Sequence, residues 1–262
     1  MIKRLEMLGF NFYSAKDVKV IAEFVHNDVV TDEGIIPLMV TPNVDQIVRL
    51  DRKENHLLRE KLKNARWILP DGQPVIALSR IKFGKEKGLE ARLTGSDFFP
   101  EMWGLLKDDS SRRVLFVLPR EDLGERFKNE RPNTVYYAPP FFKLEKKDEF
   151  EEVMTQVMSF FDENPPEYVF VGLGFPKQEN IALEMFNRLK AKNKNLPKTL
   201  LLGASFEFYW GTKKRAPMFY QKAGIEFVHR IISEPRRLAK RYLWDDLPFL
   251  GIAISELRKK NK

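Results

Sequence analysis

Tyr168-Val169-Phe170-Val171-Gly172-Leu173-Gly174-Phe175-Pro176-Lys177-Gln178-Glu179 is the stretch that decides the fold. Its first part is apolar and rich in aromatic and β-branched residues, which predicts a buried strand over 168–173. Two glycines then permit a tight turn, and helical periodicity runs from 178 to 192. A buried strand that passes through a Gly-rich turn into a helix is typical of a parallel sheet in an α/β protein.

The same alternation extends in both directions along the chain. Further buried strands are expected at 35–40, 67–69, 114–118, 134–137 and 199–202, and helices at 42–65, 75–78, 98–106, 121–129 and 149–161. We therefore predict an α/β fold with a Rossmann-like parallel sheet covered by helices on both faces. In such sheets, ligands bind at the carboxyl ends of the strands, so the residues after each strand are the candidate site.

The sequence changes character at residue 211. Residues 213–262 carry thirteen Lys or Arg and five Asp or Glu, which accounts for the whole net charge of +8. Two basic helical segments are expected there, at about 221–233 and 236–245. We predict a core over 1–210 and a basic helical C-terminal appendage over 211–262. Such an appendage favours a polyanion as partner, although a solvated basic helix has the same charge pattern.

Composition excludes several kinds of site. The chain has no cysteine, so disulfides and thiolate metal sites are excluded, and its three histidines are scattered. No Asp-x-Asp triplet occurs, so we expect no bound metal and no cofactor. The charged N-terminus is not a signal peptide, and no window carries the roughly 20 apolar residues of a spanning helix. We therefore expect a cytoplasmic protein or one that is peripheral on a membrane.

Polar residues follow two of the expected strands. Thr41-Pro42-Asn43 predicts a helix start with Thr41 as N-cap and Pro42 at the first helical position. A helix N-terminus also favours anions, so Asn43 could face a ligand. In Pro70-Asp71-Gly72, the Asp-Gly pair indicates a turn. At a strand's carboxyl end, however, the Asp71 carboxylate could accept a proton from an attacking hydroxyl.

Two more segments lie before helices. In Arg92-Leu93-Thr94-Gly95-Ser96-Asp97, Ser96 or Asp97 is expected to cap the helix, and Gly95 allows a tight turn. In the opening stretch, Gly172 and Gly174 let the backbone approach a ligand closely, and Lys177 and Gln178 could hold a phosphate or a base. The turn matches neither a Walker loop nor a complete G-x-G-x-x-G fingerprint.

Taken in order, these motifs resemble the WecG/TagA/CpsF family of bacterial glycosyltransferases. The residues that carry the resemblance are Val40-Thr41-Pro42-Asn43, Pro70-Asp71-Gly72, Arg92-Leu93-Thr94-Gly95-Ser96-Asp97, Val171-Gly172-Leu173-Gly174-Phe175-Pro176-Lys177-Gln178-Glu179, Lys214-Arg215-Ala216-Pro217, Gln221-Lys222-Ala223-Gly224-Ile225-Glu226, Arg230, Glu234-Pro235 and Arg237. Each motif alone is modest, but their common order from about Thr41 to Tyr242 is specific.

The resemblance implies an inverting glycosyltransferase. It implies transfer of an N-acetylmannosamine-type or related sugar from a UDP-sugar to a polyprenyl-diphosphate-linked sugar, in cell-surface polysaccharide or teichoic acid synthesis. Asp71 then matches the general base and Thr41 a neighbouring active-site hydroxyl, while Arg230 and Arg237 match arginines that close over the diphosphate. The expected substrate-binding residues are Asn43, Gly95, Ser96, Gly172, Gly174, Lys177, Gln178, Glu207, Arg215, Arg230 and Arg237.

Several positions depart from the family pattern. Leu118-Pro119-Arg120 stands where a Gly-rich turn is usual, and Ala138-Pro139-Pro140-Phe141-Phe142 stands where Gly-Tyr-Phe is usual. Glu207 occupies a position where Asp is common, and Lys240 one where a third arginine is expected. The first three departures fall in the half expected to hold the nucleotide, so they concern the sugar donor more than the type of reaction.

Two other functions compete with the enzyme. The altered turns suit a nucleotide-sugar or polyanion-binding protein of the same fold that has lost catalysis. Nucleic-acid binding by the basic appendage is disfavoured, because residues 1–212 are neutral overall and contain no nucleic-acid motif. The expected partners are thus a UDP-sugar, a lipid-linked acceptor and the anionic inner face of the cytoplasmic membrane, with a homo-oligomer left open.

Overall fold

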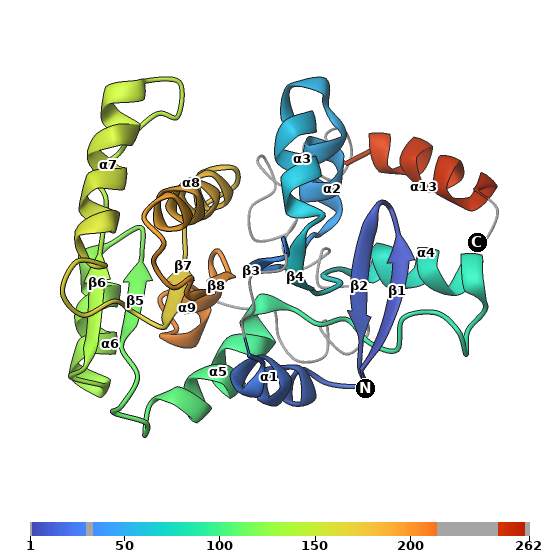
Figure 1. Ribbon diagram of the computed structural model, residues 1–262. Coiled ribbons are helices and arrows are strands. Elements are labelled where there is room, and N and C mark those ends of the chain that lie inside the picture. The colour runs from blue at the N-terminus through green and yellow to red at the C-terminus, as the bar shows by residue number, and fades with distance from the viewer. Residues whose placement is uncertain (1, 30–33, 214–245, 260–262) are drawn as a thin grey trace.

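The structure is a computed structural model that describes residues 2–29, 34–213 and 246–259. Its centre is a six-stranded sheet in which every pairing is parallel, as predicted. The strand order is β4-β3-β8-β7-β5-β6 (Figure 1). The strands are β3 (Ile36–Val40), β4 (Ala65–Ile68), β5 (Val114–Val117), β6 (Thr134–Tyr137), β7 (Tyr168–Val171) and β8 (Lys198–Leu201).

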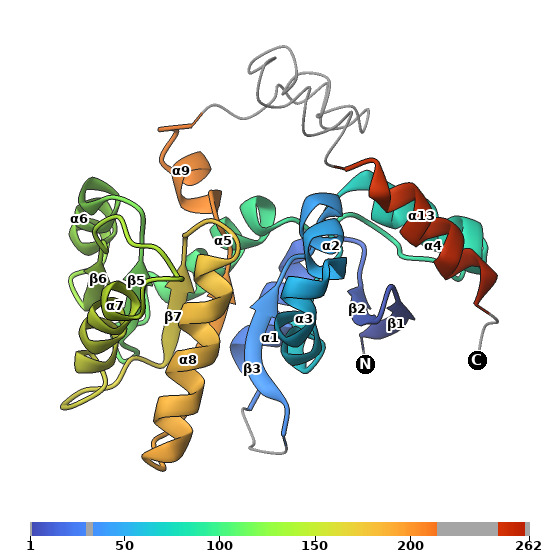
Figure 2. The same cartoon turned by 90° about the horizontal axis from the view of Figure 1, so that it is seen from above.

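Helices cover both faces of this sheet (Figures 1 and 2). Alternate strand residues feed two apolar clusters: Leu115 and Val117 lie in one, Val114 and Phe116 in the other. The first cluster includes residues of α2 (Val44–Asp51), α3 (His56–Leu62), α4 (Gln73–Phe83), α7 (Lys147–Ser159), α8 (Lys177–Ala191) and α13 (Pro248–Arg258). The second includes residues of α1 (Val18–Asn27), α5 (Gly95–Leu106), α6 (Glu121–Glu130) and α9 (Ser205–Tyr209). A sheet buried on both faces explains why its strands are continuously apolar.

Two parts of the fold differ from the prediction. The single helix expected over 42–65 is wrong: α2 ends at Asp51, a short 3-10 helix follows at Lys53–Asn55, and α3 begins at His56. Arg52 is extended there, and the Asn55 side chain donates a hydrogen bond to the Arg49 carbonyl, which ends α2. An antiparallel hairpin of β1 (Lys3–Met7) and β2 (Phe10–Ser14), and also α1, were not predicted.

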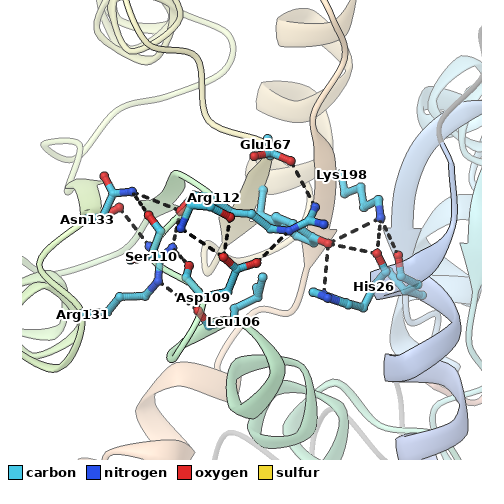
Figure 3. A network of polar contacts seen from close by, with 12 residues as sticks. His26, Leu106, Asp109, Ser110, Arg112, Arg131, Asn133, Glu167 and Lys198 are labelled. Atoms are coloured by element: carbon cyan, nitrogen blue, oxygen red, sulfur yellow. Dashed lines mark hydrogen bonds and ion pairs between the residues drawn. The ribbon is translucent and has the colours of Figure 1, made fainter.

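A polar network closes the amino end of the sheet (Figure 3). Lys198 is the first residue of β8, and its buried ammonium donates to the carbonyls of Val25 and His26 at the end of α1. Arg131, at the end of α6, donates to the carbonyl of Leu106 at the end of α5 and to that of Asp109 in the loop before β5. These charges tie helix ends and loops to the sheet on the side opposite to the candidate site.

The C-terminal helix α13 packs against the core. Phe249 lies in the apolar cluster beside α2, and the Lys82 ammonium is 2.6 Å from the Glu256 carboxylate, with both side chains buried. Most of the appendage assigned to 211–262 lies outside the described residues, so the division at residue 210 stays a prediction. In the described ranges, no helix has both the length and the apolar character needed to cross a membrane.

Candidate active site at the carboxyl edge of the sheet

The strand-end motifs meet along one edge of the sheet, because all six strands are parallel. Asp71 follows β4, and the neighbouring β3 is followed by Thr41 and Asn43. The segment that holds Glu207 follows β8, and the Gly172–Lys177 turn follows β7. The topology thus brings together residues that are far apart in the sequence.

Asp71 lies beside the Thr41 segment. The parallel pairing of β3 and β4 continues past the strands, with Leu69 N–H donating to the Val40 carbonyl at 3.0 Å and Asp71 N–H to the Pro42 carbonyl at 3.4 Å. Both Asp71 and Thr41 are half-buried. The segments that carry the Asp71 carboxylate and the Thr41 hydroxyl are therefore adjacent at the edge where a ligand is expected.

Asn43, not Thr41, caps α2. Its side-chain oxygen accepts from the Gln46 N–H at 3.1 Å, while its own N–H donates to the Gln46 side chain at 3.2 Å. The prediction that Thr41 is the cap and Pro42 the first helical residue is wrong, because this reciprocal capping box starts the helix at Val44. Thr41 is therefore not the N-cap of α2.

The segment before α5 runs alongside Asp71. Leu93 N–H donates to the Pro70 carbonyl at 2.9 Å. Thr94 is the N-cap of α5, since its hydroxyl accepts from the Asp97 N–H, so the expected capping by Ser96 or Asp97 is wrong. Ser96 lies in the first turn, with its hydroxyl 3.1 Å from that of Thr94.

Two glycines at this edge are explained by packing. A methyl group on Gly95 would lie 3.0 Å from the Ser205 hydroxyl, and one on Gly172 would lie 2.6 Å from the Phe206 ring. Both contacts fall on α9 and bring α5 and β7 close to it. At Gly174 a methyl group would meet nothing within 4 Å, and this residue is exposed. Of the two glycines in the turn, Gly174 therefore has the room for a ligand to approach the backbone.

Lys177 is the first residue of α8, and two phenylalanine rings hold its ammonium. The nitrogen lies 4.5 Å from the centre of the Phe141 ring and 4.4 Å from that of Phe142. Phe142 is buried, whereas Phe141 is 82% exposed. Cation–π contacts fix the charge near a helix N-terminus, where backbone N–H groups also favour anions. The unusual Ala138–Phe142 segment thus positions the predicted phosphate-binding lysine, which sequence reasoning had missed.

Gln178 and Glu179 are both buried, although both are polar. The Gln178 amide nitrogen donates to a Glu179 carboxylate oxygen at 2.9 Å. Desolvation by burial raises the pKa of Glu179 to about 7. The sequence contains a signal for the burial of Gln178 and Glu179. Their helical spacing to Ile181 and Ala182 places both polar residues on the covered face of α8.

Glu207 and Arg120 come from neighbouring regions of the edge. Glu207 is half-buried in α9, and its carbonyl accepts from the Lys213 N–H at 3.1 Å. Arg120 follows β5 and donates two hydrogen bonds to the Asp122 carboxylate, at 2.8 and 2.6 Å. That carboxylate, with a smaller contribution from Glu207, raises the pKa of Arg120. The turn that departs from the family pattern therefore carries a permanent positive charge at the edge.

Three predicted site residues, Arg215, Arg230 and Arg237, lie outside the described residues. Among the residues that the structure does describe, no group of three His, Cys, Asp or Glu side chains could hold a metal ion. The carboxyl edge of the sheet therefore combines three features. They are the Asp71 carboxylate on the segment next to Thr41, the Lys177 ammonium packed against two rings, and the N-terminus of α8. Such an arrangement can take a proton from a nucleophile and stabilise an anionic leaving group.

Comparison with known proteins agrees with this chemistry. Residues 5–262 match the profile of the glycosyl transferase WecG/TagA/CpsF family. An N-acetylglucosaminyldiphosphoundecaprenol N-acetyl-β-D-mannosaminyltransferase of Bacillus subtilis is 27% identical over 77% of this chain and 73% of its own length. Enzymes of the same description from Staphylococcus aureus and Bacillus spizizenii are 26% and 28% identical, over 78% and 79% of this chain and 74% and 75% of their own lengths.

Proposed function

Because this chain belongs to the WecG/TagA/CpsF family of glycosyltransferases, we propose that it transfers an N-acetylmannosamine-type sugar, or a related one, from a UDP-sugar to a polyprenyl-diphosphate-linked acceptor. The names of the relatives support the transferred sugar and the acceptor, since those enzymes transfer N-acetylmannosamine to a lipid-diphosphate-linked N-acetylglucosamine. The product would enter cell-surface polysaccharide or teichoic acid synthesis.

The observation that carries this proposal is the position of Asp71 beside Thr41 at the carboxyl edge. In the proposed step, an acceptor hydroxyl oxygen bonds to the anomeric carbon while the bond from that carbon to the diphosphate oxygen breaks on the opposite face. Asp71 takes the hydroxyl proton and UDP leaves as the anion. One displacement of this kind inverts the configuration at the anomeric carbon.

The leaving diphosphate requires positive charge, which Lys177 and the first turn of α8 supply on one side. Arg215, Arg230 and Arg237 are proposed to supply the rest. We propose that no metal takes part, because the chain lacks the Asp-x-Asp triplet with which many sugar-nucleotide enzymes hold a metal on the diphosphate.

We also propose that the enzyme works on the anionic inner face of the cytoplasmic membrane. On α13, apolar side chains at helical spacing are exposed on one side: Leu247, Leu250, Ile254 and Leu257. Arg258 and Lys259 follow directly. An apolar stripe beside basic residues is typical of a helix that lies in a membrane interface. Phe249 lies on another side of α13 and packs into the core.

An acceptor-dependence assay tests the function. The protein is incubated with a panel of UDP-sugars, with and without a short-chain lipid-diphosphate-linked N-acetylglucosamine, and UDP release is measured. We expect UDP release only with the acceptor, and most with an N-acetylated hexosamine donor. If a UDP-sugar binds but is not turned over, either with or without the acceptor, the protein would instead be a binding protein that has lost catalysis. The altered turns at 119–120 and 138–142 are consistent with that alternative.

A further inference from the structure

The first turn of α8 contains a buried acid that the proposed reaction does not use. Glu179 is 2% exposed and Gln178 is 4% exposed. One oxygen of the Glu179 carboxyl accepts from Gln178, but its other oxygen has no hydrogen-bond partner among the described residues. The Gln178 side-chain oxygen likewise has none within those residues. Unpaired buried oxygens are costly, so this pair is a strained feature at a helix N-terminus.

Within the described residues, no ion pair neutralises the Glu179 carboxylate. In the described part of the chain, Arg49 of α2 is the charged side chain from a neighbouring element that acts on its carboxyl, and it is the weakest cause of the pKa shift. The Arg49 guanidinium is otherwise engaged: it lies over the Phe175 ring, donates to the Phe175 carbonyl at 3.5 Å and is 3.8 Å from the Asp45 carboxylate. Burial raises the pKa of this carboxyl to about 7, so its protonated form is populated near neutral pH.

The location of this acid matters for an anionic ligand. Lys177, two residues before Glu179, stands at the end of the helix that is proposed to face the sugar donor's diphosphate. An ionised carboxylate in that first turn would repel the diphosphate through a poorly solvated region, where electrostatic interactions are strong. The protonated form removes this repulsion. Its O–H group can also donate a hydrogen bond, which the ionised carboxylate cannot do.

We propose that Glu179 is the proton-binding residue of the sugar-donor site, and that the diphosphate binds together with a proton on this side chain. Glu179 acts here through charge and through the position of Gln178, so it is a positioning residue and not a catalytic one. The inference rests on the proposed function, because it takes the UDP-sugar diphosphate to lie at the start of α8.

Proton linkage predicts a pH profile for binding. As the pH rises above about 7, Glu179 ionises in the unliganded protein, and each binding event must then return a proton. The dissociation constant of the UDP-sugar should increase by up to about tenfold per pH unit above that point. Glu179→Gln is neutral at every pH and nearly isosteric, so its dissociation constant should not show this dependence.

Calorimetry measures the proton directly. UDP-N-acetylmannosamine is titrated into the full chain at pH 8 in two buffers with different ionisation enthalpies, and the difference in heat gives the protons taken up. This probe is a diphosphate diester and has no ionisation of its own near pH 8. We expect uptake of a substantial fraction of one proton by the wild type and none by Glu179→Gln. Equal uptake by both proteins, or none by the wild type, overturns the inference.

A second measurement separates this inference from the proposed function. A raised carboxyl pKa means that the folded state holds a proton that the unfolded chain has lost, so the free energy of unfolding falls as pH rises from about 4.5 to about 7. Glu179→Gln should lack that fall. If the two proteins instead show parallel unfolding curves over this range, Glu179 is not the titrating group. If the curves differ as expected but no UDP-sugar binds either protein, the sugar-donor assignment fails and the coupling fails with it.

Discussion

The backbone N–H of Asp71 donates to the carbonyl oxygen of Pro42 at 3.4 Å, which anchors the proposed base next to the segment that carries Thr41. Because the backbone holds this position, Asp71→Asn should keep the fold and the affinity for the UDP-sugar. Loss of a positioned base typically costs about 10²–10⁴-fold in rate. Steady-state kinetics should therefore show a lower kcat at an unchanged melting temperature.

Asp162→Asn is a matched control, since Asp162 is exposed in the loop after α7 and pairs with Lys194. Its kcat should equal that of the wild type. A kcat of Asp71→Asn within threefold of wild type would remove Asp71 from the mechanism.

Arg237 lies outside the described residues, and its role rests on the family match and on the charge of the C-terminal region. We expect Arg237→Ala to lower turnover by about 10–100-fold, the loss of one charge-assisted contact to the diphosphate. The melting temperature should change by less than about 2 °C. Arg52→Ala, at an exposed position just after α2, is the control for the loss of one positive charge. Unchanged kinetics with a large fall in melting temperature would make Arg237 a structural residue.

Turnover should survive chelation. The reason is the missing Asp-x-Asp triplet, together with the proposed use of lysine and arginine to stabilise the diphosphate. Initial rates are measured after dialysis against EDTA and again after addition of magnesium or manganese. If the initial rate falls to zero with EDTA and returns with either metal, the cationic side chains alone do not stabilise the leaving diphosphate.

The exposed apolar stripe of α13 gives the membrane proposal a specific target. We expect the wild-type chain to sediment with liposomes that contain anionic lipid at low salt and to be released at high salt, since each engaged Lys or Arg contributes about 1 kcal/mol. The double variant Leu250→Asn and Ile254→Asn should bind more weakly without unfolding, because both side chains are exposed.

Truncation after about residue 224 would be a simpler test of the same membrane role. The structure makes it unsuitable, because it would also remove Phe249 from the core and Glu256 from its pair with Lys82. Equal sedimentation of the double variant and the wild type, or no sedimentation of the wild type at low salt, would contradict membrane docking through α13.

Lys198 predicts a pH dependence of stability at the opposite end of the sheet (Figure 3). Burial lowers the pKa of Lys198 to about 8, whereas the unfolded chain keeps the ordinary value of 10.5. Between these values the unfolded state binds a proton that the folded state has lost, so the free energy of unfolding should rise with pH. The rise in the free energy of unfolding is at most about 1.4 kcal/mol per pH unit.

Urea unfolding at pH 7, 8, 9 and 10 tests this prediction. Lys198→Met should lack the rise, whereas Lys61→Met, which changes an exposed lysine on α3, should keep it. Parallel curves for Lys198→Met and the wild type would show that Lys198 stays charged in the folded protein throughout this range.

Much of the sheet could be predicted because its strands are buried on both faces. Val114–Val117 and Tyr168–Val171 are fully buried and read as unbroken apolar runs. The hairpin of Lys3–Ser14 was missed, although Leu5, Met7, Phe10 and Phe12 supply the apolar positions that two paired strands require.

The location of the site could also be predicted, but its local geometry could not. Strand ends identify the edge, since that follows from the parallel topology. The caps at Asn43 and Thr94 depend on which of several neighbouring polar side chains reaches a backbone N–H, and that choice depends on local backbone angles. The burial of Glu179 depends on helices packed from elsewhere in the chain.

Both ends of the segment 214–245 are attached to the same sheet. On one side, Lys213 is hydrogen-bonded to Glu207 just after β8, and on the other, α13 packs against α2, which follows the neighbouring β3. The proposed contacts of Arg215, Arg230 and Arg237 with the diphosphate would therefore be intramolecular, with an effective concentration set by the two flanking attachments. A separate peptide that carries these arginines would lack this effective concentration. It should therefore restore activity to a truncated chain only at about millimolar concentrations.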